Sequence, residues 1–251
     1  IRPGISPETL KAAGIRHVSA DEARQLCGKA EPGIWIPFLS LYGTPIMDGG
    51  KPYGRLRLDS PATEQGKYHQ QKGTRIHAYL PPGLSKFPRE QDLVLVEGEF
   101  KALSLVEVGI PAIGISGFYG WGCEHSELGK QIVEDILLVK YDLAPARILF
   151  LGDSDTALNY QFSDAATKLA KESRHPVVLP RIPFSGPGKG IDDCREKLKG
   201  EFPSWLKNLV ESAVSVKKKT PPCALYDLTI WFKKCRTPNP HLRVSVCGFN
   251  Q

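Results

Sequence analysis

The chain has 251 residues, 41% of them hydrophobic, and a formal net charge of +6, which describes an ordinary soluble protein able to bury a core. No apolar run approaches the roughly 18 residues of a membrane span, so we expect no membrane partner and a cytoplasmic location. The mild positive charge favours a polyanion such as nucleic acid, and the six cysteines lack the C-x-x-C spacing of a zinc site.

The part before residue 90 is expected to form a small basic α+β unit. Two short helices are expected within residues 5–26, because Ser6 and Ser19 can each cap a helix start. Strands are expected at 33–43 and 54–60, joined by a turn-rich segment. Arg55 and Arg57 alternate with leucines, so both arginines should lie on one face of a strand.

Residues 67–83 combine positive and aromatic side chains. Lys67 and Lys72 are interleaved with Tyr68 and His69, a mixture that suits backbone phosphates and stacked bases. A solvated strand face would have the same composition, so both interpretations are open for these residues taken alone. Prolines and a glycine at 81–88 indicate a linker, and we place a domain boundary near residue 90.

From residue 92 onward, strands and helices are predicted to alternate. Buried strands are expected at Leu93–Glu97, Ala112–Ile115, Ile148–Leu151 and Val177–Leu179. Helices are expected after the first strand up to Gly109, at 128–138, from the third strand to Ala170, and at 203–216. This alternation predicts an α/β fold with a parallel sheet covered on both faces. The tail at 221–251 is expected to contain a helix and a strand.

Acidic residues follow two of the predicted strands. Glu97 ends the first strand, and Asp153 and Asp155 follow the third. Carboxyl ends of parallel strands face the crevice where open α/β sheets bind ligands, so we expect these carboxylates to converge. Such a group suits Mg²⁺ (or Mn²⁺) and nucleotidyl or phosphoryl transfer. The alternative for Asp153 is that it caps the following helix.

Two glycine-rich loops accompany these strands. The first carries Phe118, Tyr119 and Trp121, which could lie beside a bound nucleotide or simply cover the end of the sheet. The second, at 184–190, brings Lys189 and Asp192 to a helix start and lacks the spacing of a Walker loop. Asp193 follows, and interaction with the helix dipole is the alternative to a functional role for it.

Three motifs together carry a resemblance to a known family. VEG (96–98), GDSD (152–155) and GKGIDD (188–193) resemble a Toprim domain, the α/β module shared by bacterial-type primases, topoisomerases and some nucleases. Upstream, ISPETLKAAGI, IWIPFLSLYGTPI and GKYHQQKGT resemble the catalytic core of bacterial-type primases and of primase-like proteins of phages and plasmids. The resemblance covers roughly residues 5–195.

This resemblance implies a domain order and residue roles. A primase-like basic α+β subdomain would occupy residues 1–90, a Toprim catalytic domain 91–195, and a helical or mixed extension 196–251. The implied catalytic residues are Glu97, Asp153 and Asp155, and Asp192 would join them as a metal ligand. The expected nucleic-acid- or nucleotide-binding residues are Arg55, Arg57, Lys67, Tyr68, Lys101 and Lys189.

Two positions depart from the primase pattern. Lys101 stands where primases often have an aspartate, and Gly190 stands where the last motif has its first acid. A lysine there removes a possible metal ligand and adds a charge that can bind phosphate. Either the number of metal ions is lower or the activity differs. The chain also lacks a zinc-ribbon cysteine cluster.

The sequence as a whole predicts a primase-like, magnesium-dependent nucleotidyltransferase. It would make short primers on single-stranded DNA from nucleoside triphosphates, in the replication of a phage or plasmid-like element, and the likeness to primases implies a replicative helicase as a partner. A metal-dependent nuclease and a non-catalytic module that binds single-stranded nucleic acid are the alternatives. Nucleotide incorporation, strand cleavage and magnesium-independent binding distinguish the three.

Overall fold

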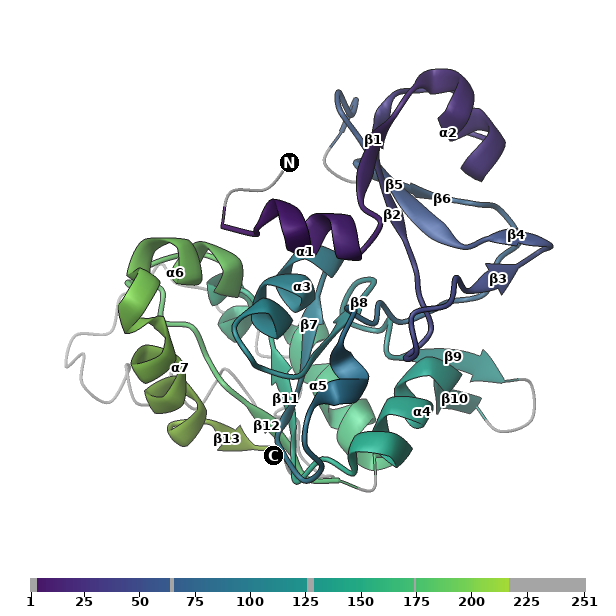
Figure 1. Cartoon of the computed structure of the whole chain (residues 1–251). Helices are drawn as coiled ribbons and strands as arrows, with labels where there is room; N and C mark the ends of the chain where they lie inside the picture. The colour runs from purple at the N-terminus through teal and green to yellow at the C-terminus, as the bar shows by residue number, and fades with distance from the viewer. Residues whose placement is uncertain (1–3, 64–65, 126–128, 174, 217–251) are drawn as a thin grey trace, which may run out of the picture.

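The structure is a computed structural model that describes residues 4–63, 66–125, 129–173 and 175–216. A smaller antiparallel sheet lies beside a larger sheet that is flanked by helices (Figure 1). The predicted α/β class, with a smaller α+β unit before a helix-flanked parallel sheet, is confirmed. No helix in the described part of the chain is long and apolar enough to cross a membrane. The helix and strand expected within 221–251 lie outside the described residues.

The smaller unit consists of a four-stranded sheet and two helices. Its elements are α1 (Pro7–Ala12), β1 (Arg16–Val18), α2 (Ala20–Cys27), β2 (Gly33–Pro37), β5 (Gly54–Leu58) and β6 (Tyr68–Gln70), with strand order β1-β2-β5-β6. The side chains of Ser6 and Ser19 accept hydrogen bonds from backbone N–H groups in the first turns of α1 and α2, which confirms the predicted helix starts. A short hairpin of β3 (Met47–Asp48) and β4 (Lys51–Pro52) lies between β2 and β5.

The alternation in β5 sorts its side chains onto two faces. Leu56 and Leu58 are buried with Trp35 against α2, whereas Arg55 and Arg57 are only partly covered. The prediction that both arginines share one face is confirmed. At Arg55 this face contacts the larger unit, because Arg55 forms an ion pair with Glu99.

The larger sheet has five strands in the order β13-β12-β11-β7-β8. They are β7 (Leu93–Glu97), β8 (Ala112–Ile115), β11 (Ile148–Leu151), β12 (Val177–Leu179) and β13 (Val214–Ser215). The first four are parallel to one another and have the predicted bounds, while β13 adds an antiparallel edge. Their buried apolar runs explain this placement, because both faces of the sheet are covered.

Helices cover both faces of the larger sheet. The helices are α3 (Glu99–Glu107), α4 (Glu134–Leu143), α5 (Tyr160–Glu172), α6 (Ile191–Leu198) and α7 (Phe202–Glu211). Val94 and Val96 of β7 belong to the hydrophobic cluster with α1, α3, α6 and α7, while Leu93 and Leu95 belong to the cluster with α4 and α5. The period of two along a strand therefore divides the core into two layers.

Three predicted helices differ from the structure. The helix expected at 128–138 is wrong, since β9 (Gly122–His125) and β10 (Gly129–Ile132) form a hairpin and α4 begins only at Glu134. Ile132, Val133 and Ile136 are all buried, and their spacing fits a strand end followed by a helix as well as a helix alone. After β11, a 3-10 helix (Ser154–Leu158) precedes α5, and the helix expected at 203–216 ends at Glu211 before β13.

The segment expected to be a linker packs against the larger sheet. A 3-10 helix forms at Leu84–Lys86, and Leu84 is fully buried. Just upstream, Tyr79 makes an antiparallel bridge to Gly114 in β8. The domain boundary near residue 90 stays a prediction from the sequence.

Candidate active site

Glu97 and Asp153 lie at the same edge of the larger sheet because of strand register. Val96 of β7 is the partner of Leu151 of β11, and both strands run in the same direction. Glu97 ends β7, and Asp153 follows β11 after one glycine. Both side chains line one cavity of about 360 Å³. The carboxyl edge of the sheet is therefore hollowed where the sequence predicts a site.

The same cavity brings basic and aromatic residues of the smaller sheet to these acids. It is lined by Arg55, Lys67, Tyr68, Glu97, Gly98, Glu99, Phe100, Lys101, Ile115, Gly117 and Asp153. Six of the ten predicted site residues are among them, namely Arg55, Lys67, Tyr68, Glu97, Lys101 and Asp153. Arg57, Asp155, Lys189 and Asp192 do not line it.

Arg55 forms one wall of the cavity together with two partners. Its guanidinium donates to Glu99 Oε1 at 2.6 Å and lies 4.6 Å from the centre of the Tyr68 ring. The Glu99 side chain is only 3% exposed, so this ion pair is buried and fixes the small sheet against the start of α3. Glu99 was not among the predicted site residues. Its position two residues after Glu97, in the first turn of a helix, was the available signal.

Two of the three predicted metal-binding aspartates, Asp153 and Asp155, are each paired with a lysine. Lys101 Nζ donates to Asp153 Oδ1, and Lys189 Nζ lies 2.9 Å from Asp155 Oδ2. The Asp153 side chain makes no capping hydrogen bond to the following helix, which contradicts the capping alternative. A backbone hydrogen bond of 2.8 Å from Ser154 to Lys189 O holds the second glycine-rich loop beside β11.

Glu97 has the properties of a proton acceptor. Burial raises the pKa of Glu97 above its usual range; the Lys101 ammonium opposes the shift, and the nearby carboxylates of Asp153 and Asp155 add to it. A carboxylate with a raised pKa accepts a proton more readily near neutral pH than an ordinary one.

The start of α6 holds the remaining predicted acid. Asp192 is buried, with 9% of the residue exposed, and it lies beside Gly190 rather than in the cavity. Asp193 accepts a hydrogen bond of 3.0 Å from the Gly190 N–H. Asp193 therefore acts at the amino-terminal end of α6, as the alternative to a functional role expected.

The first glycine-rich loop packs its aromatic residues rather than presenting them. Trp121 is fully buried, and Phe118 packs edge-on against Phe162 of α5. The Tyr119 hydroxyl donates to Asp164. These side chains cover the sheet, as one of the two interpretations expected, and only Gly117 of this loop reaches the cavity.

The arrangement does not fit a divalent metal ion as the side chains lie. Within residues 4–63, 66–125, 129–173 and 175–216, no three His, Cys, Asp or Glu side chains are grouped so that they could hold a metal. One carboxylate oxygen of Asp153, Oδ1, accepts a hydrogen bond from the Lys101 ammonium. The predicted ligands Glu97, Asp153, Asp155 and Asp192 are thus near one another but do not form a coordination set.

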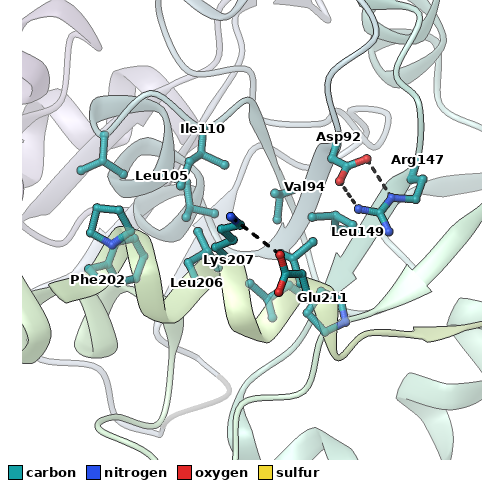
Figure 2. A pocket seen from close by; sticks show the side chains of 15 residues that line it. Asp92, Val94, Leu105, Ile110, Arg147, Leu149, Phe202, Leu206, Lys207 and Glu211 are labelled. Atoms are coloured by element: carbon teal, nitrogen blue, oxygen red, sulfur yellow. Dashed lines mark hydrogen bonds and ion pairs between the residues drawn. The ribbon is translucent and has the colours of Figure 1, made fainter.

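A second cavity, of about 440 Å³, has a different character (Figure 2). It lies between α3 and α7 over β7 and β11, with apolar residues such as Val94, Leu149 and Leu206 on its walls. Figure 2 shows its charged residues paired with one another, Asp92 with Arg147 and Lys207 with Glu211. It offers no convergent polar groups, so the cavity at Glu97 is the candidate site.

Comparison with known proteins finds a family model that matches part of the chain. The model of a family described as "Domain of unknown function (DUF3854)" matches residues 86–198. No curated protein matches the sequence.

Solved structures that resemble this one include three bacterial-type primase fragments. A DNA primase domain from Pseudomonas aeruginosa is 14% identical with a TM-score of 0.58, covering 92% of this chain and 73% of that one. The E. coli primase catalytic core is 14% identical with a TM-score of 0.55, covering 91% and 74%. The DnaG primase catalytic domain bound to ssDNA is 14% identical with a TM-score of 0.55, covering 91% of this chain and 73% of that one. The chain therefore has the fold of a primase catalytic core.

Proposed function

We propose that this protein is a primase-like nucleotidyltransferase that acts on single-stranded nucleic acid at the cavity of Glu97 and Asp153. One observation carries the proposal: a single cavity joins the cations and the aromatic ring of the small sheet to the acids at the carboxyl edge of the large one. The cations and the aromatic ring suit the phosphates and bases of a strand, and the acids suit proton transfer.

In the proposed reaction, a 3′-hydroxyl attacks the α-phosphate of a nucleoside triphosphate and pyrophosphate leaves. Glu97 accepts the proton of the attacking hydroxyl, because its partly buried carboxylate has a raised pKa. Lys67 and the Arg55–Tyr68 pair hold the template, by charge and by stacking. As they lie, the predicted ligands do not fit the expected Mg²⁺ or Mn²⁺. A helicase partner and a phage or plasmid-like replicon stay predictions from the sequence.

Primer synthesis on single-stranded DNA with labelled nucleotides tests the proposal. Glu97→Gln and Asp153→Asn should each lower incorporation about a hundredfold or more, since each removes a charge beside the reacting groups. Glu211→Gln at the apolar cavity is the matched control and should incorporate like wild type. Equal incorporation by wild type and the Asp153→Asn variant would remove the proposal.

Binding of the strand gives an independent test of the cavity. Lys67→Ala should weaken single-strand binding and reduce the slope of log K against log salt by about 0.7, as expected for one lost phosphate contact. Lys207→Ala, at the rim of the other cavity, should leave both quantities unchanged.

One observation favours a second candidate, a non-catalytic module that binds single strands. The ion pair between Lys101 and Asp153 neutralises an acid that transfer chemistry would use. This candidate predicts no incorporation by wild type, together with full binding that depends on Lys67 and does not depend on magnesium. The two assays above therefore separate the candidates.

A further inference from the structure

Lys101 is held beside the acids of the cavity by a partly buried hydrogen bond to Asp153. It lies in the first turn of α3, after Glu97, and its Nζ donates to Asp153 Oδ1. The two side chains are only 13% and 23% exposed, so water screens the pair poorly. The ammonium is therefore a fixed charge of this site and not a solvated surface group.

Gly190 leaves the space that this arrangement uses. A Cβ atom at Gly190 would lie 3.0 Å from Lys101 Cε, 2.7 Å from Asp192 Oδ1 and 3.2 Å from Asp153 Oδ1. Each of these contacts is closer than ordinary packing allows, so any larger residue would displace the lysine stem or the buried carboxylate. The missing side chain at 190 and the long side chain at 101 are thus complementary in shape.

The charges around this point call for a cation. Glu97 and Asp153 line one cavity, and Asp155 and the buried Asp192 lie close by. Crowded carboxylates repel one another and require a positive partner to stay ionised together. A divalent ion is the common partner in such clusters, but the described residues contain no three-ligand group for one.

We infer that the Lys101 ammonium is a built-in monovalent cation that takes the position of a divalent metal ion at Asp153 and keeps such an ion out. The inference concerns the protein alone and does not depend on primer synthesis. Lys101 therefore has a positioning role, because its ammonium holds the Asp153 carboxylate and does not itself coordinate a metal ion.

Binding of Mn²⁺ to the purified chain, without template or nucleotide, tests this inference. Calorimetry and the electron paramagnetic resonance signal of free Mn²⁺ both report it. Wild type should bind weakly, and Lys101→Met, which keeps the length and removes the charge, should bind at least about tenfold more tightly. Lys101→Arg should not gain affinity, and Lys101→Met combined with Asp153→Asn should lose the gain.

The controls make every outcome informative. Lys189→Met removes the exposed lysine paired with Asp155 and should change Mn²⁺ binding less than Lys101→Met does. Equal Mn²⁺ affinity in wild type and Lys101→Met would overturn the inference. Should Lys101→Met fail to fold, as judged by circular dichroism, Asp153→Asn in the wild-type background decides. Weak Mn²⁺ binding that is the same in wild type and Asp153→Asn supports the inference. Tight Mn²⁺ binding by wild type that is lost in Asp153→Asn overturns it.

Discussion

Gly98 has a backbone conformation that only glycine adopts readily. Its φ of 101° and ψ of 151° place it outside the regions open to residues with a Cβ atom. It follows Glu97 directly, and its N–H donates to Ile115 O in β8 at 3.0 Å. This one residue therefore turns the chain from β7 into α3 and sets the direction from which Lys101 reaches Asp153.

Replacing Gly98 by alanine should lower the free energy of unfolding by about 1–3 kcal/mol, because of backbone strain. No atom would collide with the new methyl group, so the loss isolates the conformational effect. Urea denaturation measures it. Gly200→Ala is the control, because that position has open space and no left-handed backbone, and it should change stability by less than about 0.5 kcal/mol. Equal losses for the two variants would contradict the interpretation.

At the scale of elements, Glu107 joins the end of α3 to two other helices. It accepts hydrogen bonds from the Ser6 N–H at 2.8 Å and the Thr9 hydroxyl at 2.6 Å, and it pairs with Arg195 of α6 at 2.6 Å. Burial alone would raise the pKa of Glu107, but these hydrogen bonds outweigh burial and lower the pKa to about 2. The ionised carboxylate thus ties α1, α3 and α6 together.

Replacing Glu107 by glutamine should reduce the free energy of unfolding at neutral pH by about 2 kcal/mol. A lowered pKa in the folded state means that the stabilisation is present above the unfolded pKa of about 4.3 and is lost as pH falls toward about 2. The difference between wild type and variant should therefore shrink on acidification. Denaturation curves between about pH 2 and 7 measure it, with Glu211→Gln as the exposed control. A difference that does not change with pH would argue against the ionised contact.

Sequence reasoning located elements best where both faces of a strand are buried. The strands Leu93–Glu97 and Ala112–Ile115 were predicted to the residue, because each apolar run is followed within two residues by a glycine, Gly98 or Gly117. The strand β1 was missed, since only Val18 of its three residues is buried. The apolar residues near Ile132 fit two kinds of element, and their spacing does not reveal the hairpin pairing of Ile132 with Gly122 that decides between them.

The same limit applied to the site. Strand order and register placed Glu97 near Asp153, and this part followed from the sequence. The pairing of Lys101 with Asp153 depends on side-chain direction and on the space at Gly190, which spacing along the chain does not reveal. Glu99 was not predicted as a site residue, because its partner Arg55 comes from a separate sheet.

Across the whole molecule, His77 connects the smaller unit with the helical layer of the larger one. Its ring nitrogens lie 3.3 Å from Asp48 Oδ2, in β3, and 3.1 Å from Asp135 Oδ2, in α4. The hydrogen bond to Asp135 raises the pKa of His77, and Asp48 adds to this although burial opposes it. The protonated ring can donate to both carboxylates at once, so this contact is strongest when His77 is charged.

The melting temperature should therefore depend on pH through His77. A raised pKa in the folded state gives stabilisation that is complete below the unfolded pKa of about 6.5 and is lost as pH rises through the folded value. His77→Gln should cost more stability at about pH 6 than at about pH 9, as measured by thermal denaturation. At His175, where burial lowers the pKa, the same substitution should show the opposite trend. A cost at His77 that is independent of pH would refute the proposed charged bridge.

The space at Gly190 also makes positions 101 and 190 depend on each other. A Cβ atom at 190 would lie 2.7 Å from Asp192 Oδ1 and 3.0 Å from Lys101 Cε, so a larger residue there requires these side chains to move. Substitutions at 101 and 190 should therefore have non-additive effects on stability. A side chain introduced at 190 should be tolerated better when the residue at 101 is short.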